Sequence, residues 1–581
     1  MKWLSPAWRS ASAFVAELWR EDRATAWVAS LHALGALLVA GWDLPGAFGW
    51  ECDGIAPRDL FRTVGANLTP GSGHNYPLFH GLLLLLLSLP FLLAGLGRWL
   101  LVGGSIRDAM LTPLTMTGIS VVAKLTAIAM STLTLLLLAR LARRLFGVRA
   151  GYLTTLFAAT MLAFAYYSRT SNLDVPYLFW TVLAVERYVA ALPDRRGYAP
   201  AAACAALALA TKDQAYASFV LVALVYAVLL PLVTRGFVAD RRTHFRNLAR
   251  AALTFVVVYG VASPALLNPT GFVYRLRLLS GQNSQEWRNY EPTLAGKLEN
   301  LRDLVRLAPE HLWPWPVFGL VLVGLVLSVR RRPLGFLPAC AAVSSVLLFT
   351  LVAARREARF VLPAGLWLSV YAGAGAAIAL SAIERGLSPG PLRRAVSLLL
   401  VSALALPGAL RVTALAFTQW RDARRGLEAW LSELPRGTRV ETYGKLVYQP
   451  HFDVSSSAPY RVTRIDTARG AKRNPMPGVS ELDPPFSGIE KRAPDVLILQ
   501  EAWIRRFTEP DRAAARVRQK DLANEDAVGF FRKATSGGIP GYRSSRAFES
   551  ELPGWLSALG QSPIKLHGST GERVFVVERE R

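Results

Sequence analysis

Long apolar runs separated by short basic connections fill most of the first 412 residues of this chain. Residues 81–95 and residues 133–138 are two such runs. Hydrophobic residues make up 52% of the 581 residues and charged residues only 18%, whereas a soluble protein carries about a quarter charged residues. Runs of this kind bury themselves in lipid. The chain is therefore predicted to be a polytopic membrane protein with a soluble part after it.

Eleven segments are apolar and long enough, with their flanks, to cross the hydrocarbon as helices. These predicted spans are 26–41, 113–139, 151–167, 176–192, 200–210, 218–233, 251–267, 316–329, 334–353, 360–383 and 395–412. The run 77–101 is also apolar, but counting it as a span would place the basic loop 140–149 on the outside. We therefore predict that it lies along the outer membrane face or re-enters it as a juxtamembrane helix.

Basic clusters predict the sidedness of the spans, because Lys and Arg are retained in cytoplasmic loops. Five such clusters fall at alternate connections, namely 140–149, 195–196, 235–250, 330–332 and 385–394. The same rule explains the net charge of +25 without nucleic acid as a partner. We predict an inner (plasma) membrane protein with a cytoplasmic N-terminus and a periplasmic or extracytoplasmic C-terminus.

The tail after residue 412 contains no predicted span. We predict a helix at 423–434 and strands at 438–443, 460–465, 495–499 and 574–578, separated by Pro and Gly. The predicted domains are thus a transmembrane domain, 1–412, and a periplasmic α/β domain, 413–581. Three scattered cysteines are too few for a disulfide framework.

Ionisable residues near membrane depth mark function by default, and many of them share the predicted external face. The first external loop holds Glu51 and Asp53, then His74 and Tyr76. Later connections contribute Asp174, Lys212 and Arg359. Such a set suits transfer from an anionic lipid, in which basic residues hold a phosphate. Asp53 is the candidate general base, and direct displacement at the anomeric carbon would invert configuration.

Simpler interpretations stay open for each residue. Asp53 and Glu51 could be solvated loop carboxylates, and Asp174 could be only the N-cap of its helix. Lys212 could reach the interface by snorkelling, and His74 could be an interfacial histidine. Glu51 and Asp53 could also share a divalent cation, which leaves metal dependence unknown and no cofactor required.

Several function classes lose support because their motifs are missing. The chain has no G-x-x-x-x-G-K-[ST] loop, no G-x-G-x-x-G fingerprint, no H-E-x-x-H and no G-x-S-x-G. The two halves also do not resemble each other, as they would in many secondary transporters. A non-catalytic lipid-glycan transporter or envelope-assembly scaffold remains the main alternative to an enzyme.

The order of the motifs resembles the GT-C superfamily of membrane glycosyltransferases, in particular bacterial protein O-mannosyltransferase-like and aminoarabinose-transferase-like proteins. The matching motifs are Trp50-Glu51-Cys52-Asp53-Gly54, Asn75-Tyr76-Pro77-Leu78, Tyr167 to Pro176 (YSRTSNLDVP), Ala210-Thr211-Lys212-Asp213-Gln214, and Glu357 to Pro363 (EARFVLP). The likeness covers roughly residues 26–363.

The resemblance implies an all-α GT-C bundle that moves one sugar from a polyprenyl-phosphate carrier to an acceptor (protein, lipid or glycan) at the periplasmic face. It implies catalytic roles for Asp53 and Asp174, and phosphate binding by Lys212, Arg359 and Arg169. Glu51, His74 and Tyr76 would bind acceptor or substrate. Two positions depart from the family pattern: no lysine precedes Pro77, and Phe360 replaces a tyrosine.

Overall fold

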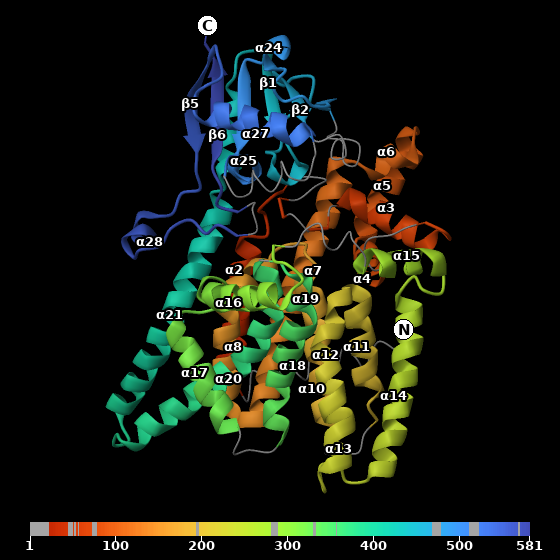
Figure 1. The fold of residues 1–581 in the computed structure, drawn as a ribbon, viewed down its shortest axis with the longest axis vertical. Coiled ribbons are helices and arrows are strands. Elements are labelled where there is room, and N and C mark those ends of the chain that lie inside the picture. The colour runs from red at the N-terminus through yellow and green to blue at the C-terminus, as the bar shows by residue number, and fades with distance from the viewer. Residues whose placement is uncertain are drawn as a thin grey trace. The chain divides into compact units, whose positions relative to one another are not determined.

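The chain divides into two compact units, one of residues 1–40 and 55–412 and one of residues 41–54 and 413–581. A computed structural model describes residues 22–44, 50–51, 54–55, 57–72, 78–192, 197–280, 289–328, 333–355, 357–466, 478–509, 522–566 and 570–580. The first unit is helical throughout, and the second is built on a β-sheet (Figure 1).

The helices of the first unit follow one another with short breaks. In chain order they are α2 (Arg23–Leu38), α3 (Pro57–Leu68), α4 (Leu78–Leu87), α5 (Leu89–Val102), α6 (Ile106–Met110), α7 (Pro113–Phe146), α8 (Val148–Ala159), α9 (Leu162–Tyr167), α10 (Asp174–Ala191), α11 (Ala199–Thr211), α12 (Tyr216–Val222), α13 (Leu230–Val233), α14 (Arg241–Ala262), α15 (Pro269–Ser280), α16 (Leu294–His311), α17 (Trp315–Ser328), α18 (Leu337–Ser345), α19 (Leu351–Ala353), α20 (Ala358–Arg385) and α21 (Pro391–Trp420). A short 3₁₀ segment, η1 (Asp213–Ala215), links α11 to α12.

Each of the eleven predicted spans lies mainly within helix. Among the described residues, six helical stretches are long and apolar enough by themselves to cross a membrane. They are Pro113–Phe146, Asp213–Val233, Arg241–Ala262, Pro333–Ala353, Ala358–Arg385 and Pro391–Ser432. The chain therefore has the polytopic helical bundle that the sequence predicts.

The run 77–101 is not one straight helix. Helices α4 and α5 are long and apolar enough to cross a membrane only when taken together, and their axes are bent by 67° at the break between them. Ser88 lies between them and is fully buried. A bend of this size fits either a broken span or a re-entrant segment, so the re-entrant interpretation stays a prediction.

Helix α20 packs against α8 and α17 with very little space between the backbones. A Cβ atom on Gly375 would lie 2.0 Å from the carbonyl oxygen of Leu320, and one on Gly324 would lie 2.2 Å from that of Tyr371. Small residues permit such close approach between membrane helices. This contact fixes α20, whose first turn carries Arg359.

The second unit contains a six-stranded sheet. Its strands are β1 (Thr438–Tyr443), β2 (Tyr460–Ile465), β3 (Ser480–Leu482), β4 (Val496–Gln500), β5 (Tyr542–Phe548) and β6 (Val574–Arg579) in the order β3-β2-β1-β4-β6-β5. Strands β1 to β4 pair in parallel, and β6 pairs antiparallel with β4 and β5. Val440 of β1 lies opposite both Val462 and Val496.

Helices cover both faces of this sheet, as a mainly parallel sheet requires. Helix α22 (Ala423–Ser432) places Leu427 and Leu431 on one face. Helices α25 (Glu501–Thr508) and α27 (Leu522–Thr535) place Trp503 and Phe531 on the other. Two short helices, α24 (Ile489–Arg492) and α28 (Gly554–Ala558), complete the unit.

The prediction of an α/β tail is confirmed. The helix at 423–434 and the four predicted strands are present, each within about two residues of the expected bounds. Strands β3 and β5 were not predicted. β3 has only three residues, and most of β5 is exposed and polar, so neither has the apolar alternation that signals a strand.

Candidate functional site

A buried ion pair joins two of the residues that the sequence singled out. Asp174 is fully buried at the start of α10. Its Oδ1 atom accepts hydrogen bonds from Nζ of Lys212 at 2.7 Å and from Nε2 of Gln214 at 3.0 Å. Burial of a carboxylate is costly unless a cation compensates it. The structure thus brings Asp174 and Lys212 into one site and adds Gln214 to it.

The position of Lys212 follows from a break in the helix. Helix α11 ends at Thr211, Lys212 is extended with φ −154° and ψ 124°, and η1 begins at Asp213. Interrupted backbone at membrane depth occurs where it is buried in protein or lines a cavity. The break aims Lys212 at α10, so the snorkelling interpretation of Lys212 is wrong in this structure: its ammonium group binds Asp174 instead.

Asp174 does not act as an N-cap. Leu173 occupies the cap position of α10, and no side chain makes the capping hydrogen bond. The carboxylate is used for Lys212 and Gln214, while its second oxygen, Oδ2, accepts no hydrogen bond from any described residue. An unsatisfied buried acceptor next to a cation is a natural contact point for a polar ligand.

Arg359 lies within electrostatic range of Tyr177, which neighbours the ion pair. Tyr177 is three residues after Asp174 and is buried. The Nζ atom of Lys212 lies 5.8 Å from the centre of its ring, and the charges of both Asp174 and Arg359 act on its hydroxyl group. Arg359 also pairs with Glu357 at 2.6 Å and lies 5.0 Å from the ring centre of Phe360.

Arg169 is buried in the segment that leads into α10. Its Nε atom donates to the carbonyl oxygen of Ala165 at 2.8 Å, near the end of α9. Its charge also acts on His32 of α2.

The first external loop is tied to this segment next to its acidic motif. The N–H of Ile55 donates to the carbonyl oxygen of Ser171 at 3.2 Å, and Oγ of Ser171 donates to the carbonyl oxygen of Ile55 at 3.3 Å. Ile55 is two residues after Asp53, and Ser171 is three residues before Asp174. Asp53, His74 and Tyr76 lie outside the described residues. Glu51 is described and buried.

Three buried residues of the first unit were missed by sequence reasoning. In the sequence, nothing marks Tyr177 as a site residue except that it follows Asp174 by three positions. Lys124 of α7 is buried and donates from Nζ to the carbonyl oxygen of Ala40 at 3.0 Å. A lone lysine in the predicted span 113–139 was the signal for it. Arg275 of α15 pairs with Asp213, the neighbour of Lys212.

In the part of the chain that the structure describes, no three His, Cys, Asp or Glu side chains gather where they could hold a metal ion. The predicted sharing of a divalent cation by Glu51 and Asp53 stays a prediction, because Asp53 lies outside the described residues.

Comparisons with known proteins agree with the sequence resemblance. Residues 109–260 match the family model of dolichyl-phosphate-mannose-protein mannosyltransferases, a segment that includes Arg169, Asp174 and Lys212. No curated protein sequence matches the chain.

Among solved structures, the chain resembles an oligosaccharyltransferase from Archaeoglobus fulgidus tethered to an acceptor peptide, with 12% identity and a TM-score of 0.52 over 97% of this chain and 89% of that one. It also resembles ArnT from Cupriavidus metallidurans bound to undecaprenyl phosphate, with 14% identity and a TM-score of 0.45 over 95% and 98% of the two chains. The fold assignment rests on the first of these. The chain therefore has the GT-C fold of membrane glycosyltransferases, and its segment 109–260 resembles the protein mannosyltransferases.

Proposed function

We propose that this protein transfers a sugar from a polyprenyl-phosphate donor to an acceptor at the extracytoplasmic face of the inner membrane. The observation that carries the proposal is the buried Asp174–Lys212–Gln214 cluster, which lies within the segment that resembles mannosyltransferases acting on dolichyl-phosphate-mannose. A charged cluster at the edge of apolar helices suits the phosphate of a lipid whose tail stays in the bilayer.

In this proposal Lys212 binds the donor phosphate. An ammonium group has three N–H donors, and the one contact with Asp174 leaves two for phosphate oxygens. Arg359 supplies a second positive charge, since its charge acts on the same tyrosine as that of Asp174. Arg169 would add a third from the segment before α10. These cations would stabilise the phosphate as it leaves the sugar.

The two aspartates take different roles. Asp174 already accepts hydrogen bonds from Lys212 and Gln214, so its carboxylate is engaged in holding these two side chains. Asp174 therefore positions Lys212 and, through Lys212, the donor phosphate. Asp53 serves as the general base on the acceptor, with Glu51, His74 and Tyr76 near it in sequence.

The proposed reaction is a direct displacement. Asp53 removes the proton of an acceptor hydroxyl, the acceptor oxygen attacks the anomeric carbon, and the bond from that carbon to the phosphate oxygen breaks. The polyprenyl phosphate is the leaving group, and the positive charges of Lys212 and Arg359 stabilise its negative charge. One displacement inverts the configuration of the anomeric carbon, by analogy with inverting glycosidases.

A donor-cleavage assay tests the proposal. Full-length protein in detergent is incubated with radiolabelled polyprenyl-phosphate sugars and an extract of acceptors, and free polyprenyl phosphate and labelled product are separated. We expect both to form with the wild type and neither with Asp53→Asn. Donor binding or movement between leaflets without cleavage of the sugar–phosphate bond would overturn the proposal in favour of a transporter or scaffold.

A further inference from the structure

The first loop, before its acidic motif, is part of the C-terminal unit. Residues 41–54 group with 413–581, and the side chains of Trp42 and Trp50 are almost fully buried in that unit. The indole N–H of Trp42 donates to Oδ2 of Asp422 at 3.0 Å, and that of Trp50 donates to the carbonyl oxygen of Gln449 at 2.9 Å. Two anchors far apart in sequence from their partners thus hold this loop.

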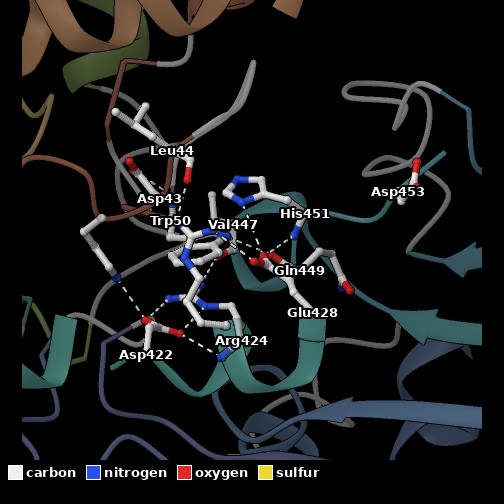
Figure 2. Close-up of polar contacts among 12 residues, drawn as sticks. Asp43, Leu44, Trp50, Asp422, Arg424, Glu428, Val447, Gln449, His451 and Asp453 are labelled. Carbon is white, nitrogen blue, oxygen red and sulfur yellow. Dashed lines mark hydrogen bonds and ion pairs between the residues drawn. The ribbon is translucent and has the colours of Figure 1, made fainter. Parts of the chain in front are cut away.

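Arg424 links the two anchors. Its Nε and Nη2 atoms donate to both oxygens of Asp422, at 2.8 Å and 2.7 Å, and Nη1 donates to the carbonyl oxygen of Val447 at 2.9 Å. Its guanidinium carbon lies 4.0 Å from the ring centre of Trp50. A guanidinium group fixed by a bidentate carboxylate presents its flat face to an aromatic ring without further ordering. Figure 2 shows this arrangement.

His451 packs on the same indole. Its ring stacks on that of Trp50 with 4.8 Å between ring centres and 18° between planes. His451 is held in turn by Glu428 of α22, whose Oε1 accepts from the backbone N–H of His451 at 2.8 Å. Arg425 donates to the carbonyl oxygen of Leu44 and pairs with Glu428. The partners named here therefore come from α22, its N-cap residue Asp422, or the segment after β1.

These partners lie at the carboxyl edge of the parallel strands. The segment after Tyr443 leaves β1 at this edge. Helix α22 precedes β1 and runs back along the sheet, so its first residue, Ala423, lies at the same edge. Doubly wound domains bind their ligands at this edge. Here the edge holds the chain's own loop. Just after β1, Trp503 packs directly on the backbone, since a Cβ on Gly444 would lie 2.3 Å from its ring.

The backbone of the loop is constrained at both anchors. Asp43 has φ 67°, which is unfavourable for a residue other than glycine, and its Oδ2 atom accepts from the N–H of Trp50 at 3.1 Å. Directly after Trp50, the N–H of Gly54 donates to the carbonyl oxygen of Glu51 at 3.1 Å. Strained backbone persists where the surroundings impose it and a function uses it.

We propose that the C-terminal domain is a clamp that positions the acidic motif of the first loop for catalysis, and that Arg424 and His451 are positioning residues acting through Trp50. This inference rests on the proposed function, because it assigns the clamp to the motif that carries Asp53. Holding Trp50 in place would lower the entropic cost of bringing the base to the acceptor at each turnover. The prediction is a loss in kcat with donor binding preserved.

Two measurements on the full-length protein in detergent test the clamp. Hydrogen–deuterium exchange follows the amides of residues 41–55, and steady-state kinetics give kcat and the KM for the polyprenyl-phosphate sugar. The disrupting variants are Arg424→Met and Trp50→Leu, and the conservative variant is Trp50→Phe. Arg546→Met is the matched control, because Arg546 of β5 lies 5.0 Å from the ring centre of Trp430 in α22, a cation–π contact that does not involve Trp50.

We expect Arg424→Met and Trp50→Leu to exchange these amides at least about 10-fold faster and to lower kcat by about 10- to 100-fold, with the donor KM within about twofold. Trp50→Phe should recover part of both effects, and Arg546→Met should change neither. Unchanged protection of β1 and β4 identifies variants that still fold. Faster exchange with normal kcat, or unchanged exchange, would overturn the clamp.

Failure of the clamp and failure of the proposed function give different results. If Asp53→Asn keeps full activity while Arg424→Met still lowers kcat, the clamp acts on another residue and Asp53 is not the base. If the wild type cleaves no donor, the proposed function fails and the clamp as a catalytic device fails with it. If Asp53→Asn is inactive while both clamp variants keep wild-type kcat, only the clamp is wrong.

Discussion

Lys212 and Asp174 form an ion pair of 2.7 Å between two helical segments, with the carboxylate fully buried and the lysine side chain 20% exposed. The pair joins the start of α10 to the break after α11. Because the lysine retains some access to the surroundings and the carboxylate has none, a ligand reaches the cation first. This difference in access fits the proposed role of Lys212 in binding the donor phosphate.

Removing Lys212 should cost more stability than removing the charge of Asp174. Lys212→Met leaves a buried carboxylate without its cation, a change that typically costs about 3–5 kcal/mol. Asp174→Asn keeps a hydrogen-bonding group and should cost less, and the double variant should regain part of the loss. Thermal unfolding in detergent measures the three variants. Arg149→Met, which breaks an exposed pair with Glu384, serves as the control and should have little effect on stability. A double variant less stable than Lys212→Met would contradict the assignment.

Lys212 should also set the affinity for the donor phosphate. We expect Lys212→Met to weaken inhibition by free polyprenyl phosphate by at least about 10-fold, which corresponds to about 1.4 kcal/mol. Competition against the labelled donor measures this effect, with Arg149→Met again as the control. An unchanged inhibition constant in a folded Lys212→Met protein would remove Lys212 from the phosphate site.

Asp53→Asn should abolish transfer while expression and folding stay intact. A general base typically contributes about 10²–10⁴-fold to the rate, and Glu51→Gln should have a smaller effect. The rate of donor cleavage at saturating donor compares the two variants, and retention of more than about a tenth of the wild-type rate by Asp53→Asn would exclude it as the base.

The membrane bundle and its two central charges could be predicted because charged residues are rare in apolar helices. Asp174 and Lys212 stand out in the sequence for that reason. Tyr177 does not, since a tyrosine in a membrane helix needs no special explanation. Lys124 carried the same signal as Lys212 but lay inside a continuous span rather than at a break.

The clamp could not be predicted from the sequence. The sequence pointed to Trp50 only as the first residue of the motif Trp50-Glu51-Cys52-Asp53-Gly54, and to Arg424 only as part of the predicted helix 423–434. Their contact at 4.0 Å joins residues that are far apart in the chain, and no local pattern encodes such a pairing. The helix α22 and the strand β1 were predictable from local sequence. The packing of Trp42 and Trp50 against them depends on the tertiary fold and was not predictable.

Two glutamates beside the β4–β6 pair should respond to pH in opposite directions. Burial alone would raise the pKa of Glu501, but hydrogen bonds from Arg573 and Lys565 outweigh it and lower the pKa to about 2. Burial raises the pKa of its neighbour Glu572, against the charge of Arg505. The stability that Glu501 contributes is thus present above its unfolded pKa of about 4.3 and is lost as the pH falls toward 2. The stability that Glu572 contributes is present below about pH 4.3 and is lost as the pH rises through its folded pKa.

At pH 7 we expect Glu501→Gln to destabilise the β4–β6 pair by about 1 kcal/mol, after discounting for solvent screening, and Glu572→Gln to stabilise it. Native-state hydrogen exchange of β4 and β6 amides at pH 7 measures both changes. Destabilisation of equal size by both variants would show that the two carboxylates act as one ionised cluster, and the opposite signs argued here would be wrong.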